Sequence, residues 1–510
     1  PSPVEKSMLW VGTDDGRVHF TQNGGASWIE VTQNIKGLPT GSWIPQIKAS
    51  NKNKGEALLV ANDYRRFNYT PYVFRTKDYG KTWTRIVDGN DVESYALAII
   101  EDVEEPNLMF LGTDDGLYVS IDAGNKWTKW TEGFPTTSVK DLVIHPREHD
   151  LVIGTFGRAA WVLDDIRPLR EIASNKAVLN NKLTLFSPPT AYQAAYQQPT
   201  GSRFGADAMY NGDNRPRGAI MSYFVKVDDK KKEMPKTDDS KKKKKSKKSK
   251  NEVAESKVKW DSVHMNIYDG DRLIRTLKRK APKESGLHKW TWYMNEKGGD
   301  RPSRSIRPRR GEPGGVTVKP GTYKVVMSFG DQTSETNITV APDPRLNVDM
   351  NSINEVYNAS KEVEKITQVT ADAVKQLVES KNIATEYSKL LAKLDKKAHK
   401  DNIKASKDIV KSIDKILELY FGKVDKRQGI TSDPNVNVGQ RIFGAARYIR
   451  SRKSGITSTE RTLMKNAKDA LNSALEKTNT FFNDEWKSYK ASMENLSLSP
   501  FKDIKSFKLD

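Results

Sequence analysis

The chain has 510 residues, 29% of them charged, with no cysteine, six histidines and a formal net charge of +20. A chain of this length can form several domains, each with its own core. The lack of cysteine excludes disulfides and thiolate metal sites, and the histidines show no ligand spacing, so we expect no metal and no cofactor. No apolar run approaches the roughly 18 residues that span a bilayer.

The positive charge is concentrated in one tract. Residues 228–250 contain 12 lysines and five acidic residues, which supplies +7 of the +20. Such a segment has too few apolar residues to fold, so residues 229–251 are predicted to be a disordered Lys-rich loop. Lysine tracts without interleaved aromatic residues bind polyanions weakly, and we therefore expect no specific nucleic-acid partner.

An octapeptide of the form Ser/Thr-x-Asp/Asn-x-Gly-x-x-Trp occurs three times, at residues 21–28, 76–83 and 120–127. The Asp or Asn side chain can accept hydrogen bonds from the amides of its own turn, and Gly adopts the positive φ that other residues resist. The Trp offers a large apolar face to a neighbouring sheet. We therefore assign a structural role to these positions: Asn23, Gly25, Trp28, Asp78, Gly80, Trp83, Asp122, Gly124 and Trp127.

Around these octapeptides lies a longer repeat. Residues 9–20 contain a short apolar strand, the turn Asp14-Asp15-Gly16 and a second strand, and residues 109–120 repeat this pattern. Asp-Gly between two apolar runs is a strong hairpin signal. The unit therefore corresponds to the second, third and fourth strands of a propeller blade. A degenerate unit at residues 151–165 lacks the octapeptide.

The octapeptides resemble the Asp-box (BNR) repeat of sialidases and sortilin-type β-propellers. The resemblance implies a propeller in which the Asp-box lies on the face away from the ligand. Three such blades and a closing one cannot form a ring, because an open array leaves blade faces uncovered. We therefore expect residues 1–170 to be the C-terminal part of a propeller, with the remaining blades on an N-terminal portion or another chain.

Two further domains are predicted. Residues 180–345 contain sparse strands with long polar insertions, which suggests an immunoglobulin-like β-sandwich. Beyond residue 345 apolar residues recur at spacings of three and four, which predicts an antiparallel helical bundle over residues 346–497. Within it, Thr457-Ser-Thr-Glu460 has the form of a capping box.

The order of propeller, sandwich and bundle resembles the large exported propeller proteins of Bacteroidota, many of which are labelled glycosyl hydrolases. The resemblance implies export to the periplasm, the outer membrane surface or the extracellular space. The chain begins at Pro1 without a visible signal peptide, which we interpret as a processed product or fragment.

Two functions remain open at this point. The first is a noncatalytic binding or scaffold protein that holds a peptide, glycan or partner protein. The second is a sialidase-like glycoside hydrolase, which requires three arginines, a Tyr/Glu nucleophile pair and an acid/base Asp; Arg158 alone cannot represent that set. We expect no catalytic residues, because the Asp-Asp pairs are explained by hairpin turns.

The binding site is predicted from an insertion in the second unit. Aligning residues 60–62 with residues 11–13 leaves six extra residues in a loop from Asp63 to Tyr72. This loop is expected at the end opposite the Asp-boxes, and Tyr, Phe and Arg are the side chains that anchor interfaces. Alternatively, the aromatic residues pack on neighbouring blades and the arginines are solvated. The ligand-binding candidates are Tyr64, Arg65, Arg66, Phe67, Tyr69 and Arg158.

Overall fold

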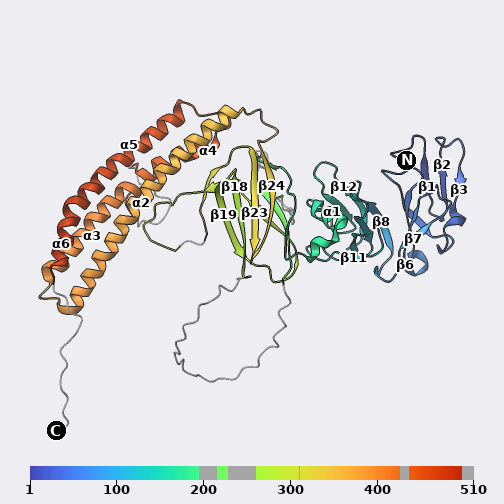
Figure 1. The fold of residues 1–510 in the computed structure, drawn as a ribbon, viewed down its shortest axis with the longest axis horizontal. Coiled ribbons are helices and arrows are strands. Elements are labelled where there is room, and N and C mark those ends of the chain that lie inside the picture. The colour runs from blue at the N-terminus through green and yellow to red at the C-terminus, as the bar shows by residue number, and fades with distance from the viewer. Residues whose placement is uncertain (195–214, 228–259, 309–310, 425–435, 497–510) are drawn as a thin grey trace, which may run out of the picture.

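The computed structural model of the chain describes residues 1–194, 215–227, 260–308, 311–424 and 436–496. Figure 1 shows three parts in a row: small sheets near the N-terminus, a larger β-structure in the middle, and long helices toward the C-terminus. The predicted Lys-rich loop 229–251 lies outside the described residues. Within the described ranges, no helix is long and apolar enough to cross a membrane.

The N-terminal part consists of four antiparallel sheets that follow one another along the chain, which we number as blades 1 to 4. Blades 2 and 3 have four strands each, and blades 1 and 4 have three. Blade 1 contains β1 (Leu9–Gly12), β2 (Val18–Thr21) and β3 (Ile29–Glu30); blade 2 contains β4 (Trp43–Ala49), β5 (Ala57–Asp63), β6 (Asn68–Thr76) and β7 (Thr84–Val87). Blade 3 contains β8 (Ala96–Glu101), β9 (Met109–Thr113), β10 (Gly116–Ser120) and β11 (Thr128–Lys129); blade 4 contains β12 (Val139–Ile144), β13 (Leu151–Thr155) and β14 (Ala160–Leu163).

The three octapeptides form the turns that were predicted. In each, the Asp or Asn side chain accepts a hydrogen bond of 2.9 Å from the backbone amide four residues later. The hydroxyl that opens the motif accepts a bond from the amide of the Gly, which has a positive φ. Because these contacts are local, the octapeptide alone specifies the hairpin.

Hydrophobic contacts join each blade to the next. Trp10 and Phe20 of blade 1 share one core with Leu59 and Phe74 of blade 2. A second core lies between blades 2 and 3, and a third lies between blades 3 and 4. The first 163 residues therefore form a continuous array of propeller blades.

A short helix that was not predicted, α1 (Arg167–Ser174), follows blade 4. Its residues Leu169 and Ile172 extend the third core, which also takes in Phe186 and Phe224 from the next part of the chain. The buried Arg170 side chain donates to Asp102 in blade 3 at 2.7 and 2.9 Å. The helix therefore fastens the blades to the structure that follows.

The middle part is built from two sheets that share one core around the fully buried Trp292. The strand orders are β15-β17-β20 and β16-β24-β23-β18-β19, with β16 parallel to β24. The strands are β15 (Leu183–Leu185), β16 (Ala191–Tyr192), β17 (Ala219–Val225), β18 (Ser262–Asp269), β19 (Arg272–Lys280), β20 (Gly286–Trp292), β23 (Gly321–Phe329) and β24 (Gln332–Ala341), and a side hairpin contains β21 (Asn295–Lys297) and β22 (Gly314–Thr317).

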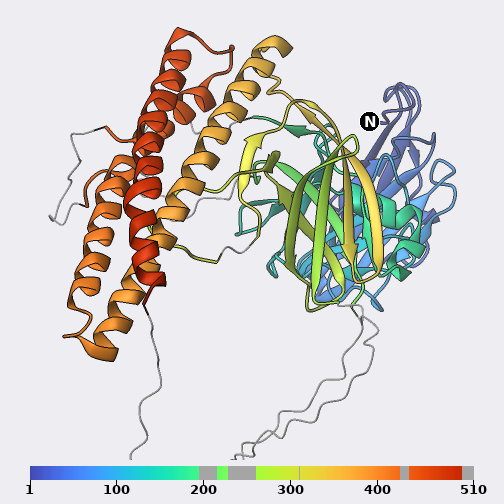
Figure 2. The same cartoon turned by 60° about the vertical axis from the view of Figure 1, so that its left-hand side comes forward.

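The C-terminal part is helical, as predicted, and its helices pack around a single core. Figure 2 shows them side by side next to the sandwich. They are α2 (Met350–Asp395), α3 (Lys400–Phe421), α4 (Val438–Ser451), α5 (Ser458–Phe481) and α6 (Lys487–Glu494), with a π-helical turn at Phe482–Trp486. The predicted capping box is present, because Thr457 and Glu460 cap each other at the start of α5.

A buried carboxylate joins the helices to the sandwich. Glu296 accepts hydrogen bonds from Tyr357 of α2 at 2.7 Å and from Arg272 of β19 at 2.9 Å, and Lys361 lies 3.3 Å away. Burial acts to raise the pKa of Glu296, but these donors outweigh it and lower the pKa. The junction is therefore an ionic clamp between two parts of the chain.

Candidate functional site

The turns between the second and third strands of the blades lie at the end opposite the Asp-boxes, since successive turns of a meander alternate between ends. We call this end the turn face. It carries Asp14–Gly16 of blade 1, the loop after Asp63 of blade 2, Asp114–Gly116 of blade 3 and Phe156–Ala159 of blade 4. The turn face is where a ligand of the propeller is expected.

The blade 2 loop differs from the alignment made on the sequence. Val60 pairs with Val73 as Gly12 pairs with Val18, so Val60, not Ala61, is the counterpart of Gly12. The inserted segment is consequently one residue longer than predicted. Most of it continues the hairpin, because Asp63 pairs with Asn68 and only residues 64–67 form the tip.

The tip is held by stacked aromatic rings. Tyr64 stacks on Tyr95 with ring centroids 4.9 Å apart and planes 13° from parallel, and Trp43 meets Tyr64 edge-on at 6.4 Å. Burial, with a hydrogen bond to Asp114, raises the pKa of Tyr95 far above its ordinary value. Tyr95 immediately precedes β8 of blade 3, so the tip of blade 2 rests on the neighbouring blade.

The two predicted arginines of the blade 2 loop are both engaged within the protein. Arg65 lies over the Trp43 ring at 4.9 Å and donates to Asp14 of blade 1 at 2.7 Å. Arg66 donates to Asp63 at 2.6 Å and to the Thr40 carbonyl at 2.7 Å. These contacts tie the tip to blade 1 on one side, as Tyr64 ties it to blade 3 on the other.

Two aromatic side chains of the hairpin point to solvent. Phe67 is 85% exposed at the end of the tip. Tyr69 is 54% exposed, and its ring also lies against Tyr95 with the centroids 6.1 Å apart. Phe67 also has a φ of 62°, a conformation that non-glycine residues rarely adopt. The structure therefore brings five of the six predicted residues together and leaves Phe67 and Tyr69 available to a partner.

The sixth predicted residue, Arg158, lies elsewhere on the turn face. It is exposed on the β13–β14 turn of blade 4, two blades from Phe67, and its carbonyl accepts a hydrogen bond from Trp161 at 2.9 Å. Its exposed neighbour Phe156 lies near Lys140. Sequence reasoning missed Trp43 and Tyr95, because neither belongs to a repeated motif.

The paired aspartates of the turns have structural roles. Asp15 accepts a hydrogen bond from Thr13 at 2.5 Å, and Asp115 accepts bonds from Thr113 at 2.6 Å and Lys129 at 2.5 Å. Burial acts to raise the pKa of Asp115, but the hydrogen bonds outweigh it and lower the pKa. Each carboxylate closes its own hairpin.

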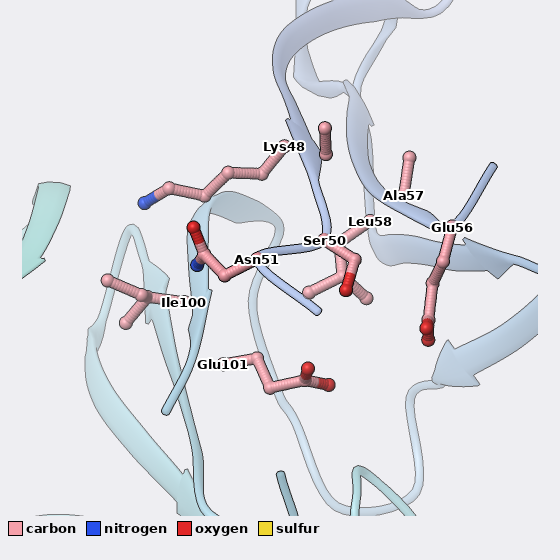
Figure 3. A pocket seen from close by; sticks show the side chains of 9 residues that line it. Lys48, Ser50, Asn51, Glu56, Ala57, Leu58, Ile100 and Glu101 are labelled. Carbon is pink, nitrogen blue, oxygen red and sulfur yellow. The ribbon is translucent and has the colours of Figure 1, made fainter. Parts of the chain in front are cut away.

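A second pair of carboxylates was not predicted. Glu56 and Glu101 line a small cavity between blades 2 and 3 at the Asp-box end (Figure 3). Arg75 lies between them, 3.4 Å from Glu56 and 2.5 Å from Glu101, and all three side chains are largely buried. Burial raises the pKa of Glu101 despite the attraction of Arg75.

This cavity has a volume of about 30 Å³, whereas pockets for organic ligands are on the order of 300 Å³ or more. A cavity of this size accommodates water and no sugar ring. Among the described residues, no group of three or more His, Cys, Asp or Glu side chains is arranged to hold a metal ion.

The comparisons with known proteins concern the blades. Residues 71–167, from β6 to the start of α1, match the family model Sortilin-Vps10, described as sortilin, neurotensin receptor 3. No curated protein matches the chain.

Several solved structures resemble parts of the chain. A GH74 enzyme of Niastella koreensis matches at 17% identity and a TM-score of 0.27, over 32% of this chain and 27% of that one. YCF48 bound to D1 peptide matches at 16% identity and a TM-score of 0.24, over 31% and 48%. YCF48 from Cyanidioschyzon merolae matches at 19% identity and a TM-score of 0.23, over 32% and 53%. This chain therefore spans about half or less of each, and these likenesses carry no conclusion about its activity.

The sortilin match and the Asp-box turns both indicate propeller blades. The match lies within blades 2 to 4, where two octapeptides form turns, and every blade is an antiparallel meander. Residues 9–163 are blades of a β-propeller of the sialidase/sortilin-like type.

Proposed function

We propose that this chain is a noncatalytic binding protein that captures a peptide, glycan or protein partner on the turn face of its blades. The observation that carries the proposal is the exposure of Phe67 and Tyr69, at 85% and 54%, on the blade 2 hairpin, whose tip is anchored to blades 1 and 3. Because the tip is already held in place, a ligand that binds these side chains pays little for ordering the loop, and exposed aromatic residues are typical of binding hot spots.

The alternative, a glycoside hydrolase, has less support. A pair of catalytic carboxylates must stand roughly 5 to 9.5 Å apart around an open substrate site. Glu56 and Glu101 share Arg75 and line only a cavity of about 30 Å³. An ion network between two blades accounts for them fully.

The remaining parts of the proposal concern architecture and location. We propose an immunoglobulin-like sandwich, supported by the order of its strands: β15, β17 and β20 in one sheet, as in strands A, B and E, and β18, β23 and β24 in the other, as in C, F and G. The division at 1–170, 180–345 and 346–497 is supported by the separate cores of the sandwich and the bundle. Export to the cell envelope rests on the resemblance of the domain order.

The proposal is tested by ligand selection and by an activity assay on the full chain. A phage-displayed peptide library and a glycan array are probed with the wild-type chain and with the double variant Phe67→Ala/Tyr69→Ala. We expect ligands that bind the wild type and not the variant. Sialosides and aryl glycosides are assayed in parallel, and turnover that disappears in Glu101→Gln would contradict the noncatalytic assignment.

A further inference from the structure

The Asp-box turn of each inner blade rests on the outer strand of the blade before it. A Cβ built on Gly124 of blade 3 would lie 3.4 Å from Ile86 of blade 2, and one on Gly80 of blade 2 would lie 3.0 Å from Val31 of blade 1. In blade 3 the Trp of the box adds to the contact, because Trp127 is 4% exposed and donates to the Ile86 carbonyl at 3.0 Å. In blade 2 the buried Trp83 Nε1 has no hydrogen-bond partner among the described residues, so the apolar contact is the shared feature. We call this contact, in which the Gly of the Asp-box packs against a β-branched residue of the preceding blade, the box seat.

A second contact joins each blade to the one after it. A Cβ on Gly112 of β9 would lie 2.6 Å from Val139 on the inner strand of blade 4, and a Cβ on Gly12 of β1 would meet Ile44 at the start of blade 2 at 2.3 Å. In blade 2 the counterpart of Gly12 and Gly112 is Val60. The counterpart of Val139 on the inner strand of blade 3 is the small Ala96, and Val60 and Ala96 belong to the same core. This contact, the strand seat, therefore pairs small with large residues across every joint.

Within the part of the chain that the structure describes, each end of the array lacks one of these contacts. The box seat of blade 1 and the strand seat of blade 4 have no residue of a neighbouring blade packed on them. In blade 1, Trp28 is 43% exposed, and the atoms nearest to a Cβ on Gly25 belong to Trp28 itself. In blade 4, the atoms nearest to a Cβ on Gly154 belong to Asp141 of the same blade, the first at 3.6 Å. Each end of the array therefore presents a surface that packs on a neighbouring blade at the inner joints and has no such neighbour here.

The apolar surfaces around the empty seats are also uncovered. Val143, Val152 and Val162 form one cross-strand row on the outward face of blade 4, and the first and last are 51% and 55% exposed. On the outward face of blade 1, Val11 is 40% exposed. At the inner joints the corresponding faces are buried in continuous cores.

A second copy of these blades cannot fill the seats. As described, blade 1 has only the second to fourth strands, so it has no inner strand to place a β-branched residue on Gly154. Blade 4, over residues 139–163, has no fourth strand to place a Val or Ile on Gly25. A partner that fills both seats must therefore contain an inner strand, which blade 1 lacks, and a fourth, outer strand, which blade 4 lacks.

We propose that the outward faces of blades 1 and 4 dock a further segment of Asp-box propeller blades. Its first inner strand places a β-branched residue on Gly154. Its last outer strand places a Val or Ile on Gly25, as Val31 and Ile86 lie on Gly80 and Gly124 at the inner joints, and one additional strand pairs with β1. The proposal does not depend on the proposed ligand-binding role of the turn face.

The experiment uses the absence of native cysteine to report on the face of blade 1. Val11→Cys is placed on the outward face, and Val103→Cys, whose native side chain is 49% exposed in a loop of blade 3, is the matched control. Maleimide labelling of each single variant is compared between the full chain and the same chain extended at Pro1 by a copy of residues 88–144. That copy contains a complete blade and the inner strand β12.

In the unextended chain, we expect the thiol of the Val11→Cys variant to react as fast as that of the Val103→Cys control. In the extended chain, the thiol of Val11→Cys should react at least about tenfold more slowly, with the rate of the control unchanged. An unchanged rate for Val11→Cys in the extended chain, with the control still native-like, would overturn the proposal. Protection of the same thiol in the unextended chain that depends on protein concentration would mean that a second copy covers the face, and would overturn it as well.

A second measurement needs no added blade. Val143→Glu lies on the uncovered face of β12 and Leu142→Glu on the fully buried face of the same strand. We expect the first to leave Tm nearly unchanged and the second to unfold blade 4. An equal loss of Tm in both would show that the outward face is already covered within the chain, and the proposal would fail.

Discussion

The Trp127 indole donates from Nε1 to the Ile86 carbonyl at 3.0 Å, which ties the Asp-box of blade 3 to the outer strand of blade 2. Trp28 occupies the same position in blade 1 and, among the described residues, has no such acceptor from a preceding blade. We therefore expect Trp127→Phe to cost about 1 to 2 kcal/mol, because it leaves buried acceptors unsatisfied. Trp28→Phe should change the free energy of unfolding by less than about 0.5 kcal/mol. Urea unfolding of the two variants checks this, and equal losses would contradict the assignment of the seats.

A second prediction compares two glycines that occupy equivalent positions. Gly112→Ala places a methyl group 2.6 Å from Val139 Cγ1, whereas Gly154→Ala meets no described atom closer than 3.6 Å. Overpacking a well-filled joint costs about 1 to 3 kcal/mol, so we expect a lower Tm for the first variant only. Neither glycine has a positive φ, so backbone strain does not complicate the comparison. A similar drop in both variants would be inconsistent with an empty seat at Gly154.

Removal of Arg75 should strongly destabilise the joint between blades 2 and 3. Arg75→Met removes the cation that is paired with both buried carboxylates, Glu56 and Glu101, and breaking such a network costs about 3 to 5 kcal/mol. The pKa of Glu101, already raised by burial, rises further in the variant. A folded-state pKa above the unfolded value means that stability is present at low pH and is lost as pH rises.

The deficit of Arg75→Met relative to wild type should therefore be largest near neutral pH and shrink as the pH falls toward the unfolded pKa of Glu. Chemical denaturation across this range measures it. A deficit that grows on acidification would show that the two carboxylates are not the cause.

Tyr95 provides a test at alkaline pH. Its pKa in the fold is raised above the unfolded value of 10.0 by burial and by Asp114. Below the unfolded pKa this group adds no pH dependence, and above it the unfolded chain loses the proton first, so stability falls as pH rises. Tyr95→Phe removes this contribution, and its free energy of unfolding should decline less steeply than that of the wild type above that pH. Parallel curves would mean that the Tyr95 hydroxyl is solvated.

The features that the sequence predicted are those specified by neighbouring residues. The Asp-box turns and the capping box of α5 involve side chains and amides within four residues of one another, so the motif contains the whole structure. Helix α1 was missed because its apolar face spans eight residues and contains Pro168. A segment this short carries too little periodicity to be distinguished from a turn.

The contacts between blades could not be predicted from the sequence, for a different reason. Tyr64 meets Tyr95 only because blades 2 and 3 pack together, and Arg75 meets Glu101 across the same joint. Neither pair has a spacing that a local pattern can reveal. The contacts of Arg65 with Asp14 and of Arg66 with the Thr40 carbonyl likewise join segments far apart in the sequence, and the role of the loop in binding stays a prediction.

The most direct test of the binding proposal is the affinity of a selected ligand for three forms of the full chain. These are the wild type, Phe67→Ala/Tyr69→Ala, and Phe443→Ala, which removes a Phe that is 67% exposed on helix α4. Calorimetric titration should give a Kd at least about tenfold weaker for the double variant, because hot-spot aromatic residues contribute about 2 kcal/mol or more each. The Phe443→Ala control should match the wild type. An unchanged Kd for a folded double variant would contradict the account.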